Sequence, residues 1–151
     1  MTRERSEKSK YKHLSTGEYC TCAAYVAEIM CMRQAEFKGS GSLPYKFWNT
    51  AKWKWPFLRQ TMVATELIKE FSEKALVRAL DKISKKTFSL NGPNVKYKVR
   101  QEQELIDKEQ QQERQKLELN EEQTFRKSSR RKKSLFNSLR DIDNGKKGSK
   151  E

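Results

Sequence analysis

Hydrophobic residues recur at helical spacing through the first hundred positions of the chain. Ser15 can cap a first helix, and Glu18 three residues later completes a capping box. Gly39 supplies the stop signal. Polar residues are expected on the other faces of this helix, at Glu28, Arg33 and Glu36. Its apolar face is expected at Tyr19, Ala23, Val26, Met30 and Phe37.

Two further helices follow a Gly-Ser loop at 39–42. Pro56 fits best in a first helical turn, which predicts a short turn at about 45–53 and a helix from about 54 to 71. Ser72 can cap the third helix. The expected buried positions are Phe57, Met62, Ala64, Leu67, Ile68 and Phe71 in the second helix, and Leu76, Ala79, Leu80 and Ile83 in the third. Short loops between these helices favour an antiparallel bundle.

The hydrophobic period changes after residue 87. Val95, Tyr97 and Val99 alternate with lysines, which is typical of a half-buried strand. The segment "NGPN" has turn chemistry, and the strand before it would contain Phe88 and Leu90. We therefore expect a small hairpin at 88–99, packed on the helices because an isolated hairpin is only marginally stable.

Beyond residue 100 the chain is polar. Residues 100–127 contain no Gly or Pro and are rich in Gln, Glu and Lys, which predicts a solvated helix without the sustained heptads of a coiled coil. A segment "SLFNSLRDI" near the end could form two amphipathic turns. The predicted organisation is a basic arm at 1–13, a helical core at 14–99, a polar helix at 100–127 and a flexible basic tail at 128–151. The fold class is mainly α, a small helical bundle that can include a β-hairpin.

Composition supports this division. Leu, Ile, Val and Phe make up 29 of 151 residues, and 20 of them fall between 14 and 99. The net charge of +13 is also uneven: +3 over 1–14, +8 over 15–100, −5 over 101–123 and +7 over 124–151. A basic body favours nucleic acid, an acidic membrane surface or an acidic protein as a partner. No run of the sequence has the length and apolarity of a membrane span.

The segment "LPYKFWNTAKWKWPFLRQ", 43–60, contains all three tryptophans among four basic residues. It can bind a polyanion through stacked rings and lysines, or it can be a core segment whose lysines face water. Trp53 and Trp55 are two residues apart, so a helix must point them in different directions. We expect Trp53 and Phe57 to anchor the core. The candidate contacts to nucleic acid are Lys46, Trp48, Lys52, Lys54, Trp55 and Arg59, with Lys96 and Lys98 added if the hairpin folds back.

A second basic cluster, "RKSSRRKK", covers 126–133 and holds six positive charges. Such a cluster gives sequence-independent affinity for nucleic acid through counterion release. It also matches a nuclear-localisation or anionic-membrane signal, and the alternative is a solvating tail. We include Arg130, Arg131, Lys132 and Lys133 among the candidate nucleic-acid contacts.

Catalytic and metal-binding signals are weak. Cys20, Cys22 and Cys31 lie near the single histidine, His13, but Cys20 and Cys22 would point apart on the predicted helix. The sequence has no nucleotide-binding loop and no hydrolase or zinc-protease motif. We therefore expect reduced thiols, in the apolar core or on a helix surface, in a cytoplasm-like compartment, with no metal site, no cofactor and no enzymatic activity.

The stretch "GSGSLPYKFWNTAKWKWPFLRQ" and the following "FSEKALVRALDK" resemble small uncharacterised basic proteins of phages and mobile elements, over roughly residues 19–103. That resemblance implies a viral or mobile-element source and work on nucleic acid, and it carries no activity.

Two functions fit these observations. The first is a nucleic-acid-binding accessory protein that contacts the phosphate backbone through the Lys/Trp segment and its basic arms. It would act in the cytoplasm, of a host cell if the source is viral, or on the nucleoid. The second is an assembly protein that docks on a larger protein through residues 100–142. Salt dependence separates them, since phosphate contacts weaken steeply with salt and apolar docking does not.

Overall fold

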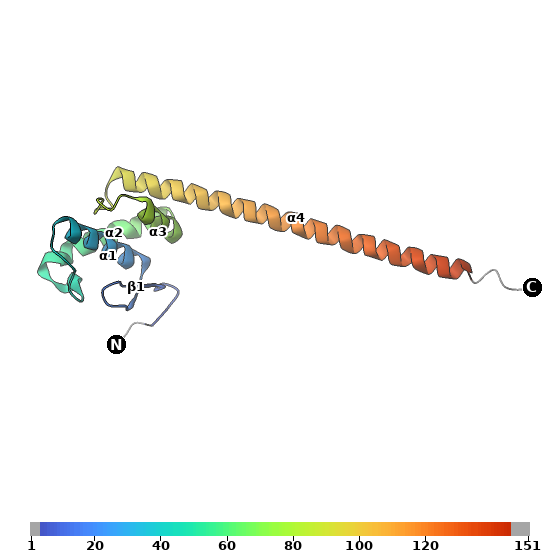
Figure 1. The fold of residues 1–151 in the computed structure, drawn as a ribbon, viewed down its shortest axis with the longest axis horizontal. Helices are drawn as coiled ribbons and strands as arrows, with labels where there is room; N and C mark the ends of the chain where they lie inside the picture. Colours follow the sequence, from blue (N-terminus) through green and yellow to red (C-terminus); the bar gives the residue numbers. More distant parts are fainter. Residues whose placement is uncertain (1–3, 146–151) are drawn as a thin grey trace, which may run out of the picture. The chain divides into compact units, whose positions relative to one another are not determined.

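A computed structural model describes the backbone of residues 4–145, and side chains through residue 128 and at 137, 139 and 140. The chain divides into two units, Met1–Ile106 and Asp107–Glu151. The fold is mostly helical with one short antiparallel strand pair, which confirms the predicted fold class (Figure 1). The elements are β1 (Tyr11–Lys12), β2 (Tyr19–Cys20), α1 (Cys22–Phe37), the 3-10 turn η1 (Phe47–Asn49), α2 (Ala51–Glu70), α3 (Glu73–Lys82) and α4 (Pro93–Gly145).

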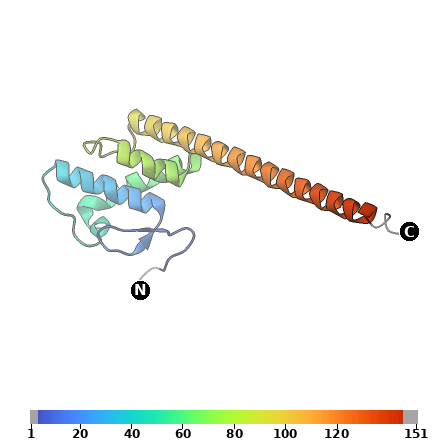
Figure 2. The ribbon, with the colours of Figure 1, turned by 45° about the vertical axis from the view of Figure 1, so that its right-hand side comes forward.

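The first helix begins later than the capping box predicted. Residues 11–20 form a hairpin in which Tyr11 pairs with Cys20 and Lys12 with Tyr19, beside the start of α1 (Figure 2). Thr21 caps α1 instead, and its side chain accepts a hydrogen bond from the Ala24 N–H. The prediction of Ser15 as the cap was therefore wrong. Backbone pairing between residues 11–12 and 19–20 competes for the groups that an earlier helical turn would use.

The buried face of α1 is centred on Ala23, Val26 and Met30, as expected. Two predictions at other positions were wrong. Phe37 is 66% exposed, because it is the last residue of the helix, and Glu28 is fully buried. The helix stops as predicted at Gly39, which has a φ of +67° and a backbone N–H that donates to the Glu36 carbonyl.

Helix α2 starts at Ala51, a few residues before the predicted position. Pro56 is therefore inside the helix rather than in its first turn, and the Lys52 carbonyl loses its usual N–H partner there. Packing of Trp53 from the first turn explains why the helix accepts this loss, since Trp53 is only 5% exposed. The predicted stripe is buried at Ala64 and Leu67 but not at Met62, which is 60% exposed.

Helix α3 agrees with the sequence prediction. The Ser72 hydroxyl accepts a hydrogen bond from the Ala75 N–H and donates one to Gln103 Oε1 at 2.7 Å. Leu76, Ala79 and Leu80 are buried. The cap thus starts α3 and also attaches it to the first part of α4.

The predicted hairpin at 88–99 is wrong. Pro93 is the first residue of α4, a position that needs no backbone N–H. Val95 and Val99 are fully buried and Tyr97 is 58% exposed, because residues four apart share a helix face while the residue between them points away. The alternation of these residues with lysines matched the pattern of a strand, although the segment is helical.

Helix α4 belongs to both units. Up to Ile106 it contributes Val95, Val99 and Ile106 to the main core, and Lys82 Nζ forms an ion pair of 2.6 Å with the buried Glu102. Residues 107–128 are exposed throughout, as predicted for a solvated helix. The helical backbone runs on to Gly145, past the boundary predicted at 127.

The first unit contains two hydrophobic clusters. The main core joins α1, α2, α3 and the first turns of α4 around Met30, Leu76 and Val99. The smaller cluster is built from Cys31, Ala35, Phe47 and Trp53. In the part of the chain that the structure describes, no helix is long and apolar enough to cross a membrane.

Candidate functional site

The Lys/Trp segment is folded around Phe47, which is fully buried. The rings of Trp48, Trp53 and Phe57 meet Phe47 edge-on, with centroids 5.2, 6.1 and 5.7 Å away. Trp48 also stacks on His13 at 4.5 Å and on Phe57 at 5.4 Å. We call Phe47, Trp48, Trp53 and Phe57 the aromatic cluster. It holds η1 against α2 and joins the N-terminal hairpin to both.

The three tryptophans have three different environments. Trp53 is buried at 5% exposure, as predicted, while Trp48 and Phe57 are half-buried in the aromatic cluster. Trp55 is 71% exposed. Residues two apart on an ideal helix differ by about 200° in direction, so burial of Trp53 turns Trp55 to the surface. The segment is therefore core on one side and open surface on the other.

The basic residues of the segment occupy the open side. Lys52, Lys54 and Arg59 are all exposed. Lys52 Nζ lies 5.7 Å from the centre of the Trp53 ring. Within the part of the chain whose side chains are described, no carboxylate lies within ion-pair distance of these three cations. We call Lys52, Lys54, Trp55 and Arg59 the basic face of α2.

Lys46 is set apart from this face. It has a left-handed backbone, with φ of +48°, at the entry to η1. Its Nζ lies 3.7 Å from Glu18 Oε1 and 5.4 Å from the centre of the Tyr45 ring. Part of its charge is thus already paired with the N-terminal hairpin.

Lys96 and Lys98 do not join the basic face. They belong to the first turns of α4, and the hairpin that was to fold them back does not exist. Lys96 Nζ bonds Glu70 Oε2 at 2.9 Å, and Lys98 Nζ bonds Gln101 Oε1 at 3.3 Å. Glu70 ends α2, about 24 Å along the helix axis from Lys54 at 1.5 Å per residue.

The basic cluster at 126–133 is only partly described. The backbone of Arg130, Arg131, Lys132 and Lys133 is helical, and their side chains lie outside those that the structure describes.

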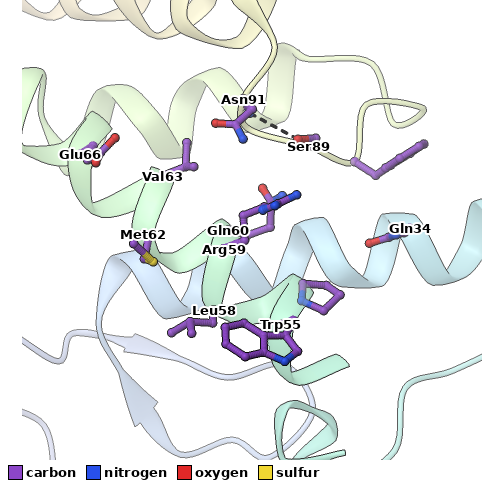
Figure 3. Close-up of a pocket in the computed structure, with 12 residues that line it drawn as sticks. Gln34, Trp55, Leu58, Arg59, Gln60, Met62, Val63, Glu66, Ser89 and Asn91 are labelled. Atoms are coloured by element: carbon purple, nitrogen blue, oxygen red, sulfur yellow. Dashed lines mark hydrogen bonds between the residues drawn. The ribbon is translucent and has the colours of Figure 1, made fainter. Parts of the chain in front are cut away.

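A groove of about 710 Å³ runs beside the basic face (Figure 3). One wall is α2, with Trp55 and Leu58 at one end and Glu66 at the other. The opposite wall consists of Gln34 of α1 and the loop between α3 and α4, which contributes Phe88, Ser89 and Asn91. Sequence reasoning missed this groove, because its two walls are about thirty residues apart in the chain.

Two side-chain contacts hold the loop wall in place. The nearly buried Gln60 accepts a hydrogen bond from the Leu90 N–H at 2.9 Å. Arg33 of α1 donates to the Thr87 carbonyl of the loop at 3.5 Å and to the Leu80 carbonyl of α3 at 2.9 Å. A buried amide that satisfies a backbone N–H is costly to break, so the groove is part of the folded structure.

A second site missed by sequence reasoning lies under the N-terminal hairpin. His13 Nδ1 is 2.8 Å from Glu28 Oε2, and the Cys20 thiol is also within hydrogen-bonding reach of the imidazole. The same carboxylate accepts from the Leu14 and Ser15 N–H groups at 3.1 and 2.8 Å. The signal in the sequence was a glutamate inside the apolar run "YVAEIM".

The Cys–His–Glu arrangement resembles the order of groups in a thiol hydrolase. Cys20 is only 1% exposed, however, and it does not line the groove beside α2. A nucleophile needs access to its substrate, so this arrangement is better explained as a structural link. Among the described residues there is no group of three or more His, Cys, Asp or Glu side chains placed to hold a metal ion.

No protein-family model, curated protein or solved structure matches this chain in the comparisons made. We therefore infer the function from the basic face of α2, the groove beside it and the charge of the chain.

Proposed function

We propose that this chain is a non-enzymatic accessory protein that binds nucleic acid through the phosphate backbone. The observation that carries the proposal is the basic face of α2. Three exposed cations, Lys52, Lys54 and Arg59, surround one exposed tryptophan, and the segment 43–60 contains no acidic residue.

The combination of charge and ring favours nucleic acid over other polyanions. Lysine and arginine side chains gain affinity for phosphates by releasing condensed counterions. An exposed indole next to them adds a surface on which a base can stack. Nucleic acid offers both a phosphate for the cations and a flat base for the ring in every nucleotide.

The rest of the chain extends this binding surface in the proposal. The N-terminal arm and the cluster at 126–133, including Arg130, Arg131, Lys132 and Lys133, are basic segments that can contact further phosphates. Lys46 lies before α2, whereas Lys96 and Lys98 lie toward its other end and would serve a longer ligand only. Sequence specificity is expected to be low, because backbone contacts carry no base information. Such a protein would act in the cytoplasm or on the nucleoid, and the basic composition suits a viral or mobile-element source.

Charge reversal of the basic face tests the proposal. The double variant Lys52→Glu and Lys54→Glu should fold normally, since exposed charges contribute little to stability. Its affinity for a labelled oligonucleotide should fall, and the slope of log affinity against log salt should flatten by about one for each lost phosphate contact. Fluorescence anisotropy between about 50 and 200 mM salt measures both quantities.

The matched control is Lys108→Glu with Lys116→Glu. Both residues are exposed in the acidic segment 101–123, so the control changes the net charge equally but leaves the basic face intact. An equal loss of affinity in both double variants would show that total charge, and not this face, drives binding. An unchanged salt slope in the Lys52/Lys54 variant would contradict the proposal.

A second function is favoured by one observation on the second unit. Leu117, Leu119 and Phe125 are 62, 57 and 74% exposed on the helix that continues from residue 107. Leu117 and Leu119 are two residues apart and point to different sides of the helix, so a larger protein that contacts all three side chains must reach more than one face of it. In this reading, binding to the partner would weaken little with added salt, and replacing Phe125 by Ala would disrupt it.

A further inference from the structure

We infer that the groove between α2 and the α3–α4 loop binds an unpaired base, so that the ligand is a single-stranded nucleic acid. This inference rests on the proposed function, because it takes the basic face of α2 as the phosphate-binding surface. It adds the kind of strand that the face selects and the residue on which the base stacks.

The floor of the groove is apolar and open. Trp55, Leu58 and Met62 follow one another at i, i+3 and i+7 on α2, which places them on one face of the helix. They are 71, 44 and 60% exposed, although each is a large apolar residue. A base ring could cover this surface in the way that an aromatic side chain would, and every base offers a flat face for such stacking.

The wall opposite Trp55 combines the Phe88 ring with three polar side chains. Gln34 comes from α1, and Ser89 and Asn91 come from the loop (Figure 3). These side chains can donate and accept hydrogen bonds at the edge of a base. The Gln60 amide oxygen already accepts one hydrogen bond, from the Leu90 N–H. An apolar floor with a few convergent polar groups is typical of a small-ligand site, and a volume of about 710 Å³ is in the usual range.

The charges along α2 favour one position for the strand, near Trp55. Lys52 and Arg59 lie three residues before and four residues after Trp55, so they flank the ring on the same side of the helix. Glu66 closes the other end of the groove, about 16 Å along the axis from Trp55. Phosphates on both sides of a stacked base can therefore reach a cation near Trp55, while the backbone is repelled from the Glu66 end.

A duplex cannot use this site. Its bases are paired and stacked on one another, so no ring face is free for Trp55, and extrusion of a base costs energy. A duplex would reach the cations of the basic face but leave the groove empty. The structure thus predicts tighter binding of a single strand than of the duplex of equal length.

The experiment compares the unmodified full chain with the variant Trp55→Ala. The ligands are a labelled DNA strand of about 15 nucleotides, its RNA equivalent and the corresponding DNA duplex, a length that covers the usual single-strand sites. Affinity for the single strands should fall about 5- to 150-fold in Trp55→Ala, and affinity for the duplex should stay the same. Quenching of tryptophan fluorescence by the single strand should be strongly reduced in Trp55→Phe, because Trp53 is buried and Trp48 is half-buried in the aromatic cluster.

Phe125→Ala is the matched control, since Phe125 is as exposed as Trp55 but lies in the second unit. Equal losses in Trp55→Ala and Phe125→Ala would overturn the groove as the site. If Trp55→Ala binds single strands normally while the Lys52/Lys54 reversal still weakens binding, the inference fails and the proposed function stands. If neither a single strand nor the duplex binds the unmodified chain, both fail.

Discussion

His13 Nδ1 lies 2.8 Å from Glu28 Oε2, and this pair joins the N-terminal hairpin to α1. The carboxylate is fully buried and the imidazole is 11% exposed. Two backbone N–H groups of the hairpin loop also donate hydrogen bonds to the carboxylate. Burial by itself would raise the pKa of Glu28, but the hydrogen bonds from His13 and Ser15 outweigh it and hold that pKa below its ordinary value.

Replacing Glu28 by Ala should destabilise the first unit strongly. The change leaves the His13 ring and the Leu14 and Ser15 N–H groups without their buried partner, and breaking a buried pair costs about 3–5 kcal/mol. Urea unfolding followed by circular dichroism measures the loss. Glu66→Ala removes an exposed glutamate from α2 and serves as the control, with an expected change within about 0.5 kcal/mol. A similar small change in Glu28→Ala would show that the pair does not hold the hairpin.

Stability should decline as the pH rises from about 6.5 to 9. Burial by itself would lower the pKa of His13, but hydrogen bonds to Cys20 and Glu28 outweigh it and raise the pKa to about 9. Since the folded pKa is above the unfolded value of about 6.5, the stabilisation is complete below pH 6.5 and is lost as the pH passes 9. Burial raises the pKa of both Cys22 and Cys31 from 9.0 to about 12, so these two thiols lower the stability mainly above pH 9, beyond this window.

The measurement is the urea midpoint across this pH range, for the unmodified chain and for His13→Gln. The variant lacks the titrating ring, so its midpoint should change less with pH. If the two profiles have the same slope, another group is responsible for the pH dependence.

Two hydroxyl residues near the start of α1 should differ in their effect on the free energy of unfolding. Thr21→Ala removes the acceptor for the Ala24 N–H and should cost about 1 kcal/mol. Ser15→Ala should be neutral or stabilising, because within the described residues the buried Ser15 Oγ has no hydrogen-bond partner. Thermal unfolding of the two variants compares them directly. A larger loss in Ser15→Ala would favour the cap predicted from the sequence.

The two tryptophans of α2 should separate stability from binding. Trp53→Ala should cost about 3–5 kcal/mol, since Trp53 is buried against Phe47. Trp55→Ala should change the free energy of unfolding by less than about 0.5 kcal/mol, since most of its ring is exposed. Guanidinium unfolding tests both predictions. A comparable loss in the two variants would mean that Trp55 also faces the core.

Local chemistry was sufficient to predict several elements. Ser72 and the apolar spacing after it predicted α3, and Gly39 predicted the end of α1. The two-residue separation of Trp53 and Trp55 predicted that one faces the core and the other faces water. The absence of Gly and Pro from residues 100–127 predicted the solvated helix. Each of these predictions depends on residues that are close together in the chain.

Some local signals were present but ambiguous. Val95, Tyr97 and Val99 fit a strand by alternation and a helix by the spacing of four between the valines. Pro93 at the first helical position resolves the ambiguity only when α4 is known to pack on the core. Ser15 with Glu18 matches a capping box, but pairing of β1 with β2 takes precedence over it.

The helical class, the basic charge and the different directions of Trp53 and Trp55 follow from the sequence, because helix geometry and charge depend on composition and short spacing. The burial of Glu28 with His13 and the position of the groove are visible only in the folded chain, because these features join residues that are far apart in the sequence. The Glu28 carboxylate becomes stable inside the protein only when residues 13–15 supply its donors, and the loop wall of the groove is attached to α2 by the hydrogen bond from the Leu90 N–H to Gln60.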